Sequence, residues 1–308
     1  MNKVAFCFPG QGSQRVGMGR DMAREFPEAA AVFDEASEEV DFDLRKVCFD
    51  GPIERLSETD ITQPALVTAS LAALRAVQGR LGVEPDVVIG HSVGEYAAIA
   101  AAESVDVSLV TRLVRERGLA MAEAARERPG SMAAVLGLAD EEVERLCAEA
   151  GDVWPANYNC PGQLVISGRE GGVAAVAEKA RELGGKVVRL RVSGAFHSPL
   201  VEDAAQRLEP VVRAAQFGEL KTRLMSTVSS KLETVDRIPG LLVEQVTAPV
   251  RFTQAVQGLL SDGVRTFVEI GPGGVLGGLV KRIDRSVTAV SIGTPEELSA
   301  AEASLAGS

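Results

Sequence analysis

Cysteine is scarce in this sequence, and no two cysteines have the spacing of a metal or redox site. There are 4 cysteines in 308 residues, and none forms the Cys-x-x-Cys pair that zinc sites and thioredoxin-like centres use. Scattered cysteines are typical of reduced thiols in the cytoplasm, not of a disulfide framework. We therefore expect a cytoplasmic protein with no metal site and no bound cofactor. The four residues are Cys7, Cys48, Cys147 and Cys160.

The sequence also lacks a long hydrophobic run and an excess of positive charge. The apolar residues 4–8 end at Pro9, so they are too short for the core of a signal peptide, and no stretch reaches the length of a transmembrane helix. The 43 acidic and 32 basic residues give a net charge of −11, whereas binding to nucleic-acid phosphates requires a basic surface. We therefore expect neither a membrane nor a nucleic-acid partner.

What remains is the composition of an ordinary globular protein, with 46% hydrophobic and 24% charged residues. Its hydrophobic pattern predicts strands that alternate with helices, among them a strand at 4–8, an amphipathic helix at 63–81 and a helix at 109–124. This alternation favours an α/β fold, in which a mostly parallel sheet is covered by helices on both faces.

The pattern changes near residue 129 and returns after residue 195. The segment between them predicts the order β-α-β-β-α-β of a ferredoxin-like domain. We therefore expect a small domain, residues 129–195, inserted into a large α/β domain made of residues 1–128 and 196–308. The expected elements of the insertion are strands at 131–138, 153–158, 163–167 and 186–192 and helices at 140–150 and 173–183.

Residues 87–96, Val-Val-Ile-Gly-His-Ser-Val-Gly-Glu-Tyr, have the pattern of a nucleophile elbow. Gly90 and Gly94 permit a sharp turn from a strand into a helix, with the Ser92 hydroxyl at its tip. The same turn places the Val93 amide at a helix N-terminus, beside the carbonyl that the serine would attack. A Gly/Ser helix cap without chemistry is the alternative interpretation.

A serine nucleophile needs a base within hydrogen-bonding distance, and the chain has only two histidines. His91 is adjacent to Ser92, where neighbouring side chains diverge, so it is better explained as a residue that packs beneath the turn. His197 lies in a loop just before Pro199, where the predicted insertion rejoins the large domain. It is therefore our candidate base, with a non-catalytic histidine at a domain junction as the alternative.

The group that would orient His197 is left open by the sequence. Glu202 and Asp203 are too close to His197 along the chain to be obvious partners, and Asp236 and Glu269 are only candidates. A backbone carbonyl is an equally suitable acceptor for the imidazole.

Two glycine-rich segments follow predicted strands but do not match a nucleotide-binding motif. Arg15 and Leu276 stand where the dinucleotide-binding fingerprint requires its third glycine, and Pro272 removes an amide that phosphates would use. We interpret residues 10–15 and 271–276 as tight turns from strand to helix at the mouth of the sheet.

Several short segments together resemble one family, in the right order and from residue 3 to about 285. This set resembles the malonyl-CoA:acyl carrier protein transacylases and the acyltransferase domains of polyketide and fatty acid synthases. The resemblance implies an α/β-hydrolase-like domain with a ferredoxin-like insertion. The matching segments are residues 9–14, 90–96, 117–118, 157–163, 196–199 and 269–273.

The family resemblance implies a role for each matching residue. Ser92 would be the nucleophile that carries the malonyl group, and His197 would be its base. The amides of Gln11 and Val93 would form the oxyanion hole, and the main-chain carbonyl of Gln245 would orient the histidine.

The resemblance also implies the substrate-binding residues. Arg117 would hold the malonyl carboxylate, for which a fixed guanidinium is well suited; without the resemblance, it looks like an ordinary arginine on a helix face. Phe196 resembles the residue of malonyl-selective members, and Asn159 matches a position in the substrate pocket. Val93 stands where leucine is common, which leaves the fine selectivity open.

The resemblance implies malonyl-CoA as the donor, an acyl carrier protein as the acceptor, and a monomer. A free-standing polyketide synthase acyltransferase and a carrier-directed acyl hydrolase are the alternatives, followed by a non-catalytic scaffold. Carrier proteins are typically acidic, so docking on this acidic chain needs a local basic patch. The candidate residues for that patch are Lys186, Arg189, Arg191, Lys281, Arg282 and Arg285.

Overall fold

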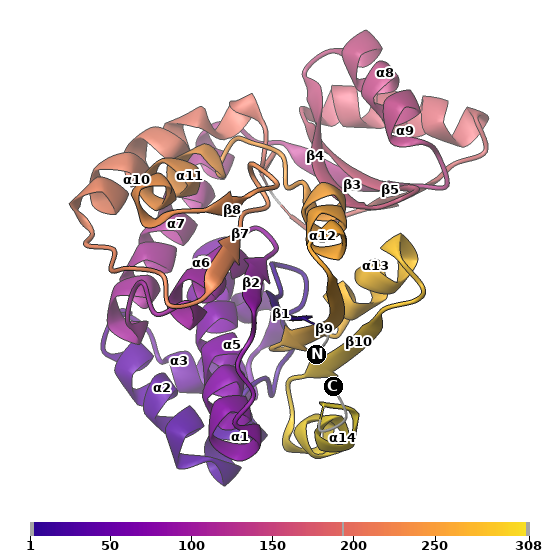
Figure 1. Ribbon diagram of the computed structural model, residues 1–308. Coiled ribbons are helices and arrows are strands. Elements are labelled where there is room, and N and C mark those ends of the chain that lie inside the picture. Colours follow the sequence, from indigo (N-terminus) through magenta and orange to yellow (C-terminus); the bar gives the residue numbers. More distant parts are fainter. Residues whose placement is uncertain (1–2, 193, 306–308) are drawn as a thin grey trace.

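The computed structural model describes residues 3–192 and 194–305 and contains two sheets (Figure 1). The larger sheet has six strands in the order β10-β9-β1-β2-β7-β8, and all neighbours are parallel except β7 and β8. The predicted mostly parallel α/β fold is therefore confirmed. The strands are β1 (Lys3–Phe8), β2 (Val87–Gly90), β7 (Arg223–Met225), β8 (Leu232–Glu233), β9 (Val264–Ile270) and β10 (Thr288–Ile292).

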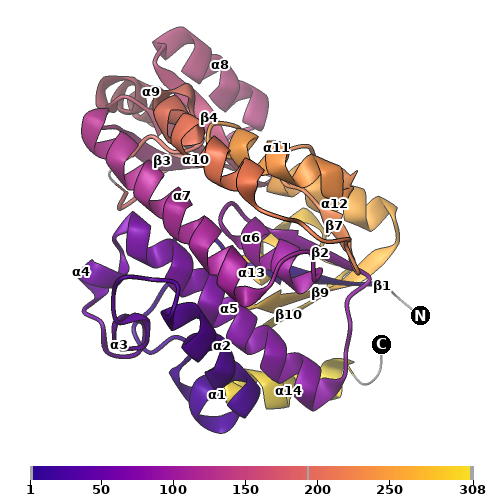
Figure 2. The same ribbon diagram turned by 90° about the vertical axis from the view of Figure 1, so that its left-hand side faces the viewer.

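Helices cover both faces of this sheet because alternate side chains of its strands point in opposite directions. Phe6 and Phe8 of β1 belong to the core on one face, whereas Ala5 and Cys7 belong to the core on the other. Figures 1 and 2 show α5, α6 and α7 on the first face, and Figure 1 shows α12 and α13 on the second. These helices are α5 (Thr59–Leu81), α6 (Gly94–Ala101), α7 (Val107–Glu127), α12 (Phe252–Ser261) and α13 (Val275–Ile283).

The remaining helices lie around this framework. Those near the first face are α1 (Arg20–Glu25), α2 (Pro27–Ser37), α3 (Leu44–Asp50), α4 (Ile53–Leu56), α10 (Glu202–Ala214) and α11 (Ile238–Glu244). The last helix, α14 (Pro295–Leu305), packs beside β10 and α1.

The helix predicted at 63–81 differs from expectation in two ways. It begins four residues earlier, at Thr59, and residues 61–74 are buried on every side instead of along one stripe. The reason is that α2, α6 and α7 pack around α5, so this helix is the centre of the large domain and not part of its surface. The prediction of a helix here is therefore confirmed, whereas the prediction that the helix is amphipathic is wrong.

The smaller sheet is antiparallel and has the strand order β4-β5-β3-β6. The chain order β-α-β-β-α-β agrees with the prediction. The last strand of this sheet ends at Arg189, three residues before the expected end at residue 192. The elements are β3 (Ser131–Leu136), α8 (Asp140–Ala150), β4 (Val153–Cys160), β5 (Gln163–Gly168), α9 (Glu170–Glu182) and β6 (Lys186–Arg189).

The two faces of the smaller sheet contact different surroundings. One face packs on α8 and α9, whereas Met132, Ala134 and Val165 on the other face belong to the main core. Strand β4 is also hydrogen-bonded to Val250, just before α12. The smaller sheet is thereby held over the carboxyl ends of the large sheet's strands. The insertion bounds of 129–195 stay a prediction, and Ser193 lies outside the described residues.

No helix in the described part of the chain has both the length and the apolar character that crossing a membrane requires.

Candidate active site

The turn after β2 has the geometry of the predicted elbow. Ser92 has a positive φ of 52°, and α6 begins two residues later. Both flanking glycines are required. A Cβ on Gly90 would lie 2.1 Å from the Glu95 nitrogen, and a Cβ on Gly94 would lie 2.1 Å from the Phe8 carbonyl oxygen. The Ser92 hydroxyl is consequently presented at the carboxyl ends of the parallel strands.

His197 meets this hydroxyl from a segment 105 residues away, with its Nε2 atom 2.8 Å from Ser92 Oγ. Its Nδ1 atom lies 2.9 Å from the Gln245 carbonyl oxygen and 3.0 Å from that of Ala248. Since carbonyl oxygens only accept, Nδ1 carries the proton and Nε2 is free to accept one from Ser92. Of the acceptors that the sequence left open, backbone carbonyls are the ones found here.

The acidic alternatives lie elsewhere. Glu269 accepts hydrogen bonds from the amides of Val275 and Gly277 at the start of α13, and Asp236 pairs with the Thr234 hydroxyl.

The surroundings of His197 keep its imidazole neutral. Its pKa is lowered to about 3, chiefly by burial and also by the nearby Arg117 and His91, although the two carbonyl contacts act in the opposite direction. A neutral imidazole at physiological pH has the protonation state that a general base requires.

Arg117 is almost fully buried, with 1% of its surface exposed, and is not an ordinary arginine on a helix face. Its Nη1 atom donates to Gln63 Oε1 at 2.7 Å, and its Nη2 atom donates to Gln245 Oε1 at 3.1 Å and to Ser92 Oγ at 3.2 Å. The Nε atom has no hydrogen-bond partner among the described residues, and burial lowers the pKa of the guanidinium. All three acceptors are neutral, so the positive charge keeps its capacity to bind an anion.

These groups open into a cavity of about 260 Å³ between the two sheets. Its lining includes the polar Ser92 and Arg117 as well as apolar residues, among them Met132 on β3 and Leu276 and Leu279 on α13. The other predicted site residues that line it are Gln11, Val93, Asn159, Phe196 and His197. Gln245 is not in the lining but contacts both Arg117 and His197.

His91 has a different partner, as its interpretation as a packing residue requires. Its Nε2 atom lies 2.8 Å from Asn159 Oδ1, and its ring lies against that of Phe252, with centroids 5.7 Å apart. It therefore links the elbow to β4 and does not compete for the Ser92 proton. The amide oxygen of Asn159 is engaged in this link.

Two polar residues of the site were missed by sequence reasoning. Gln63 lies within the buried helix α5 and holds Arg117, and Glu95 lies on α6 and contacts Gln245. The available signal was a polar residue inside an otherwise apolar helical run, Ile-Thr-Gln-Pro-Ala-Leu for the first and Gly-Glu-Tyr-Ala-Ala-Ile for the second.

The residues proposed for a basic patch lie in β6 and α13 or within two residues after them. Arg282 of α13 donates to Gln163 of β5, which lines the cavity, so this arginine lies at the cavity's rim. Lys281 donates to the Val287 carbonyl, and Arg189 of β6 pairs with Glu170. Within residues 3–192 and 194–305, no three histidine, cysteine, aspartate or glutamate side chains are grouped to hold a metal ion.

Comparison with known proteins gives a consistent result. A family model described as an acyl transferase domain matches residues 5–301. The chain is 41% identical to a malonyl CoA-acyl carrier protein transacylase from Bacillus subtilis, over 97% of this chain and 96% of the relative. A solved malonyl-CoA:acyl carrier protein transacylase from Xanthomonas oryzae has 39% identity and a TM-score of 0.95, over 99% and 98% of the two chains. A malonyl-transacylase in complex with a type II polyketide acyl-carrier protein has 38% identity and a TM-score of 0.94, over 98% and 99%.

Proposed function

Because the chain belongs to the acyl transferase domain family, an enzyme family, we propose that it moves a malonyl group from malonyl-CoA to the phosphopantetheine thiol of an acyl carrier protein. The observation that carries this proposal is the position of one hydroxyl. Ser92 Oγ lies 2.8 Å from the candidate base His197 and 3.2 Å from the buried cation Arg117. A nucleophile and a carboxylate-binding group therefore share one pocket.

In the first half-reaction, His197 Nε2 takes the Ser92 proton as Oγ attacks the thioester carbonyl of malonyl-CoA. The negative charge that develops on the carbonyl oxygen is stabilised by the amides of Gln11 and Val93, the second at the start of α6. The tetrahedral intermediate then collapses, the C–S bond breaks, and His197 returns the proton to the leaving CoA thiolate. Ser92 is left as a malonyl ester.

In the second half-reaction, the carrier's thiol occupies the place of CoA. His197 removes the thiol proton, the thiolate attacks the ester carbonyl, and the C–O bond to Ser92 breaks as the proton moves to Oγ. The same two amides stabilise the second oxyanion. No external oxidant or reductant enters the balance, since one thioester and one thiol are converted into another thioester and another thiol.

Arg117 selects the acyl group in this proposal. A malonyl carboxylate can accept two charge-assisted hydrogen bonds from the guanidinium, including one from the unpartnered Nε. Binding replaces the weak 3.2 Å contact with Ser92 and leaves that hydroxyl to His197. A group without a carboxylate, such as acetyl, gains none of these bonds.

The proposal has further parts that follow the family resemblance. The protein would act in the cytoplasm as a monomer, with residues 129–195 as an inserted domain that forms one wall of the cavity. The acidic carrier would dock near the rim at Arg282, where its phosphopantetheine can enter between α13 and the smaller sheet. Phe196, which is 4% exposed, would limit the size of the acyl group, and Asn159 would hold its place in the pocket through His91.

Intact-protein mass spectrometry tests the proposal. Incubation with malonyl-CoA should add the mass of one malonyl group to the wild type and nothing to Ser92→Ala, and the adduct should move to holo-carrier protein when it is added. A malonyl-enzyme that decays in water as fast as it reacts with the carrier would favour the acyl hydrolase. The absence of any adduct would favour the remaining alternative, a non-catalytic scaffold protein.

A further inference from the structure

Glu95 is a buried acid that the proposed reaction does not use. It lies in the first turn of α6, within the otherwise apolar sequence Gly-Glu-Tyr-Ala-Ala-Ile-Ala-Ala, and only 1% of its surface is exposed. Burying a carboxyl group is costly unless it is hydrogen-bonded, so its position calls for specific partners. Its pKa is raised to about 7, because the effect of burial outweighs that of the hydrogen bonds with Ser226, Gln245 and Thr227, which lower it.

One short contact reaches across 150 residues to Gln245. Gln245 Nε2 donates to Glu95 Oε2 at 2.6 Å, a length typical of a bond to a charged acceptor. The Thr227 hydroxyl lies 3.2 Å from the same oxygen and 3.1 Å from the Gly90 carbonyl oxygen in the elbow strand. Glu95 therefore joins the nucleophile's turn to the segment that orients the base.

This contact determines which way the Gln245 amide faces. With the NH₂ end on Glu95, the Oε1 end must face the guanidinium of Arg117, from which it accepts at 3.1 Å. The opposite orientation would direct donors at Arg117 and an acceptor at the Glu95 oxygen, which leaves buried polar groups unpaired. The main-chain carbonyl of the same residue accepts from His197, so one glutamine holds both the base and the candidate clamp.

The charge of Arg117 is balanced from a distance by the same acid. Its direct acceptors on Gln63, Gln245 and Ser92 are neutral. Burial lowers the pKa of the guanidinium, whereas the nearby Tyr96 and Glu95 raise it. A carboxylate in direct contact would stabilise Arg117 but would also occupy the site of a substrate carboxylate. With Gln245 between them, Glu95 supports the cation without blocking it.

We propose that Glu95 is a positioning residue for recognition of the malonyl carboxylate: it fixes the orientation of the Gln245 amide and thereby keeps the Arg117 guanidinium in place. This inference rests on the function proposed above and deepens it. It predicts that selectivity between a malonyl and an acetyl group depends on a residue that touches neither.

Glu95→Gln tests this directly, since the new side chain has nearly the same shape but can present either an acceptor or a donor to Gln245. Single-turnover acylation of Ser92 by malonyl-CoA and by acetyl-CoA is followed by intact mass over a range of donor concentrations. We expect the malonyl-over-acetyl ratio to fall about tenfold, chiefly through weaker binding of malonyl-CoA, as the loss of one charged hydrogen bond implies.

Glu269→Gln is the matched control. Glu269 is equally buried, at 1% exposure, but it holds the first amides of α13 and has no contact with Gln245. We expect this variant to unfold at a lower temperature and to keep the wild-type malonyl-over-acetyl ratio. A malonyl-over-acetyl ratio that fell equally in both variants would overturn the inference, because the loss of either buried acid would then lower the selectivity.

Two further variants keep the test decisive. Gln245→Leu removes the amide but keeps the main-chain carbonyl, so it should lower the ratio as Glu95→Gln does, and the double variant should fall no further than Gln245→Leu alone. If Glu95→Gln does not fold, an unchanged ratio in Gln245→Leu overturns the inference by itself. If the wild type forms no acyl-Ser92, the proposed function fails. A wild-type ratio in a malonylated Glu95→Gln protein overturns only the role of Glu95.

Discussion

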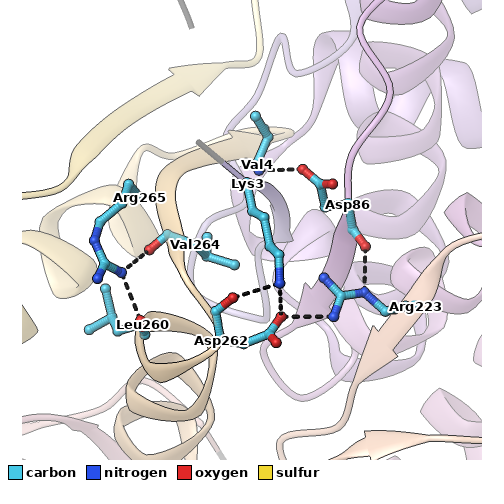
Figure 3. Close-up of polar contacts among 8 residues, drawn as sticks. All are labelled: Lys3, Val4, Asp86, Arg223, Leu260, Asp262, Val264 and Arg265. Carbon is cyan, nitrogen blue, oxygen red and sulfur yellow. Dashed lines mark hydrogen bonds and ion pairs between the residues drawn. The ribbon is translucent and has the colours of Figure 1, made fainter. Parts of the chain in front are cut away.

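The charged residues at the two ends of the larger sheet have opposite kinds of surroundings. At the amino ends of its strands, cations contact carboxylates near the surface (Figure 3). Lys3 and Arg223 both pair with Asp262, at 3.1 and 2.7 Å, and Asp86 accepts the amide of Val4 at 2.7 Å. At the carboxyl ends, Arg117 is buried and has only neutral acceptors.

The pKa shifts at the two ends show the same contrast between surroundings that favour a charge and surroundings that oppose it. The pKa of Asp262 is lowered by hydrogen bonds from Arg223 and Lys3, so its environment favours the charge. The pKa values of Arg117 and His197 are lowered chiefly by burial, so their environment opposes the charge. The ion pairs at the amino ends stabilise the fold, whereas the buried groups at the carboxyl ends have interactions that only a bound ligand would complete. Substitutions at the two ends should therefore separate activity from stability.

The largest expected effect is the loss of acylation in Ser92→Ala. Removal of a serine nucleophile typically lowers the rate by a factor on the order of 10⁴ to 10⁶. Malonyl-CoA turnover with a holo-carrier protein measures it. The matched variant at the other end, Asp262→Asn, should keep a turnover within about twofold of the wild type, since surface ion pairs contribute little. Comparable losses in both variants would erase the distinction between the two ends.

The next effect is a change of selectivity in Arg117→Ala. Two charge-assisted hydrogen bonds to the malonyl carboxylate should be lost, which corresponds to about a 10²- to 10³-fold fall in malonyl transfer. Transfer of an uncharged acetyl group should fall much less, because acetyl has no carboxylate to hold. Competition between the two donors measures the change, and an unaltered malonyl preference would refute the role of Arg117.

Local signals were sufficient to predict the chemistry at the tip of the elbow. The Gly-x-Ser-x-Gly spacing and the β-branched strand before it are short-range features, and Gly90 is required by the Glu95 nitrogen five residues away. Gly94 is part of the same local pattern, although the contact that requires it is with the distant Phe8 carbonyl oxygen. With only two histidines in the chain, His197 followed by elimination. The order of strands and helices was predictable for the same reason, since each element has its own periodicity.

The support of the site was not predictable from local signals. The burial of α5 on every side depends on three other helices, and the contact of Glu95 with Gln245 joins residues 150 positions apart. Arg117 has an ordinary helical neighbourhood in the sequence and becomes special only where α5 and α6 enclose it. Its role is therefore implied by the family resemblance and not by its local sequence.

A third prediction concerns pH. In the folded protein the pKa of His197 is lowered to about 3, whereas in the unfolded chain it lies near the ordinary value of about 6.5. Below that value the unfolded state takes up a proton that the folded state does not, so this histidine makes folding less favourable as pH falls from 6.5 towards 3. Between pH 6.5 and 5 the contribution is roughly 2 kcal/mol.

Denaturant unfolding at both pH values, in wild type and in His197→Gln, isolates this contribution, because other groups such as Glu95 titrate alike in both proteins. The wild type should lose roughly 2 kcal/mol more than the variant on acidification. In parallel, the rate of Ser92 acylation at saturating malonyl-CoA, which weaker binding does not lower, should stay fast well below pH 6.5. An acid limb of this saturated rate at pH 6.5 would contradict a neutral, buried base.

The smallest expected effect lies at the amino ends of the strands, where Asp262→Asn removes the shared partner of Lys3 and Arg223 (Figure 3). The carboxylate has a lowered pKa in the folded protein, so its contribution to stability is present above the unfolded pKa and is lost as pH falls through the folded value. Since the groups are about one third exposed, water and salt screen the interaction, and thermal unfolding at neutral pH should shift by only a few degrees. The shift in unfolding temperature should shrink in high salt. A large, salt-independent shift would mean that Asp262 is as well shielded from water as the charged groups at the carboxyl ends.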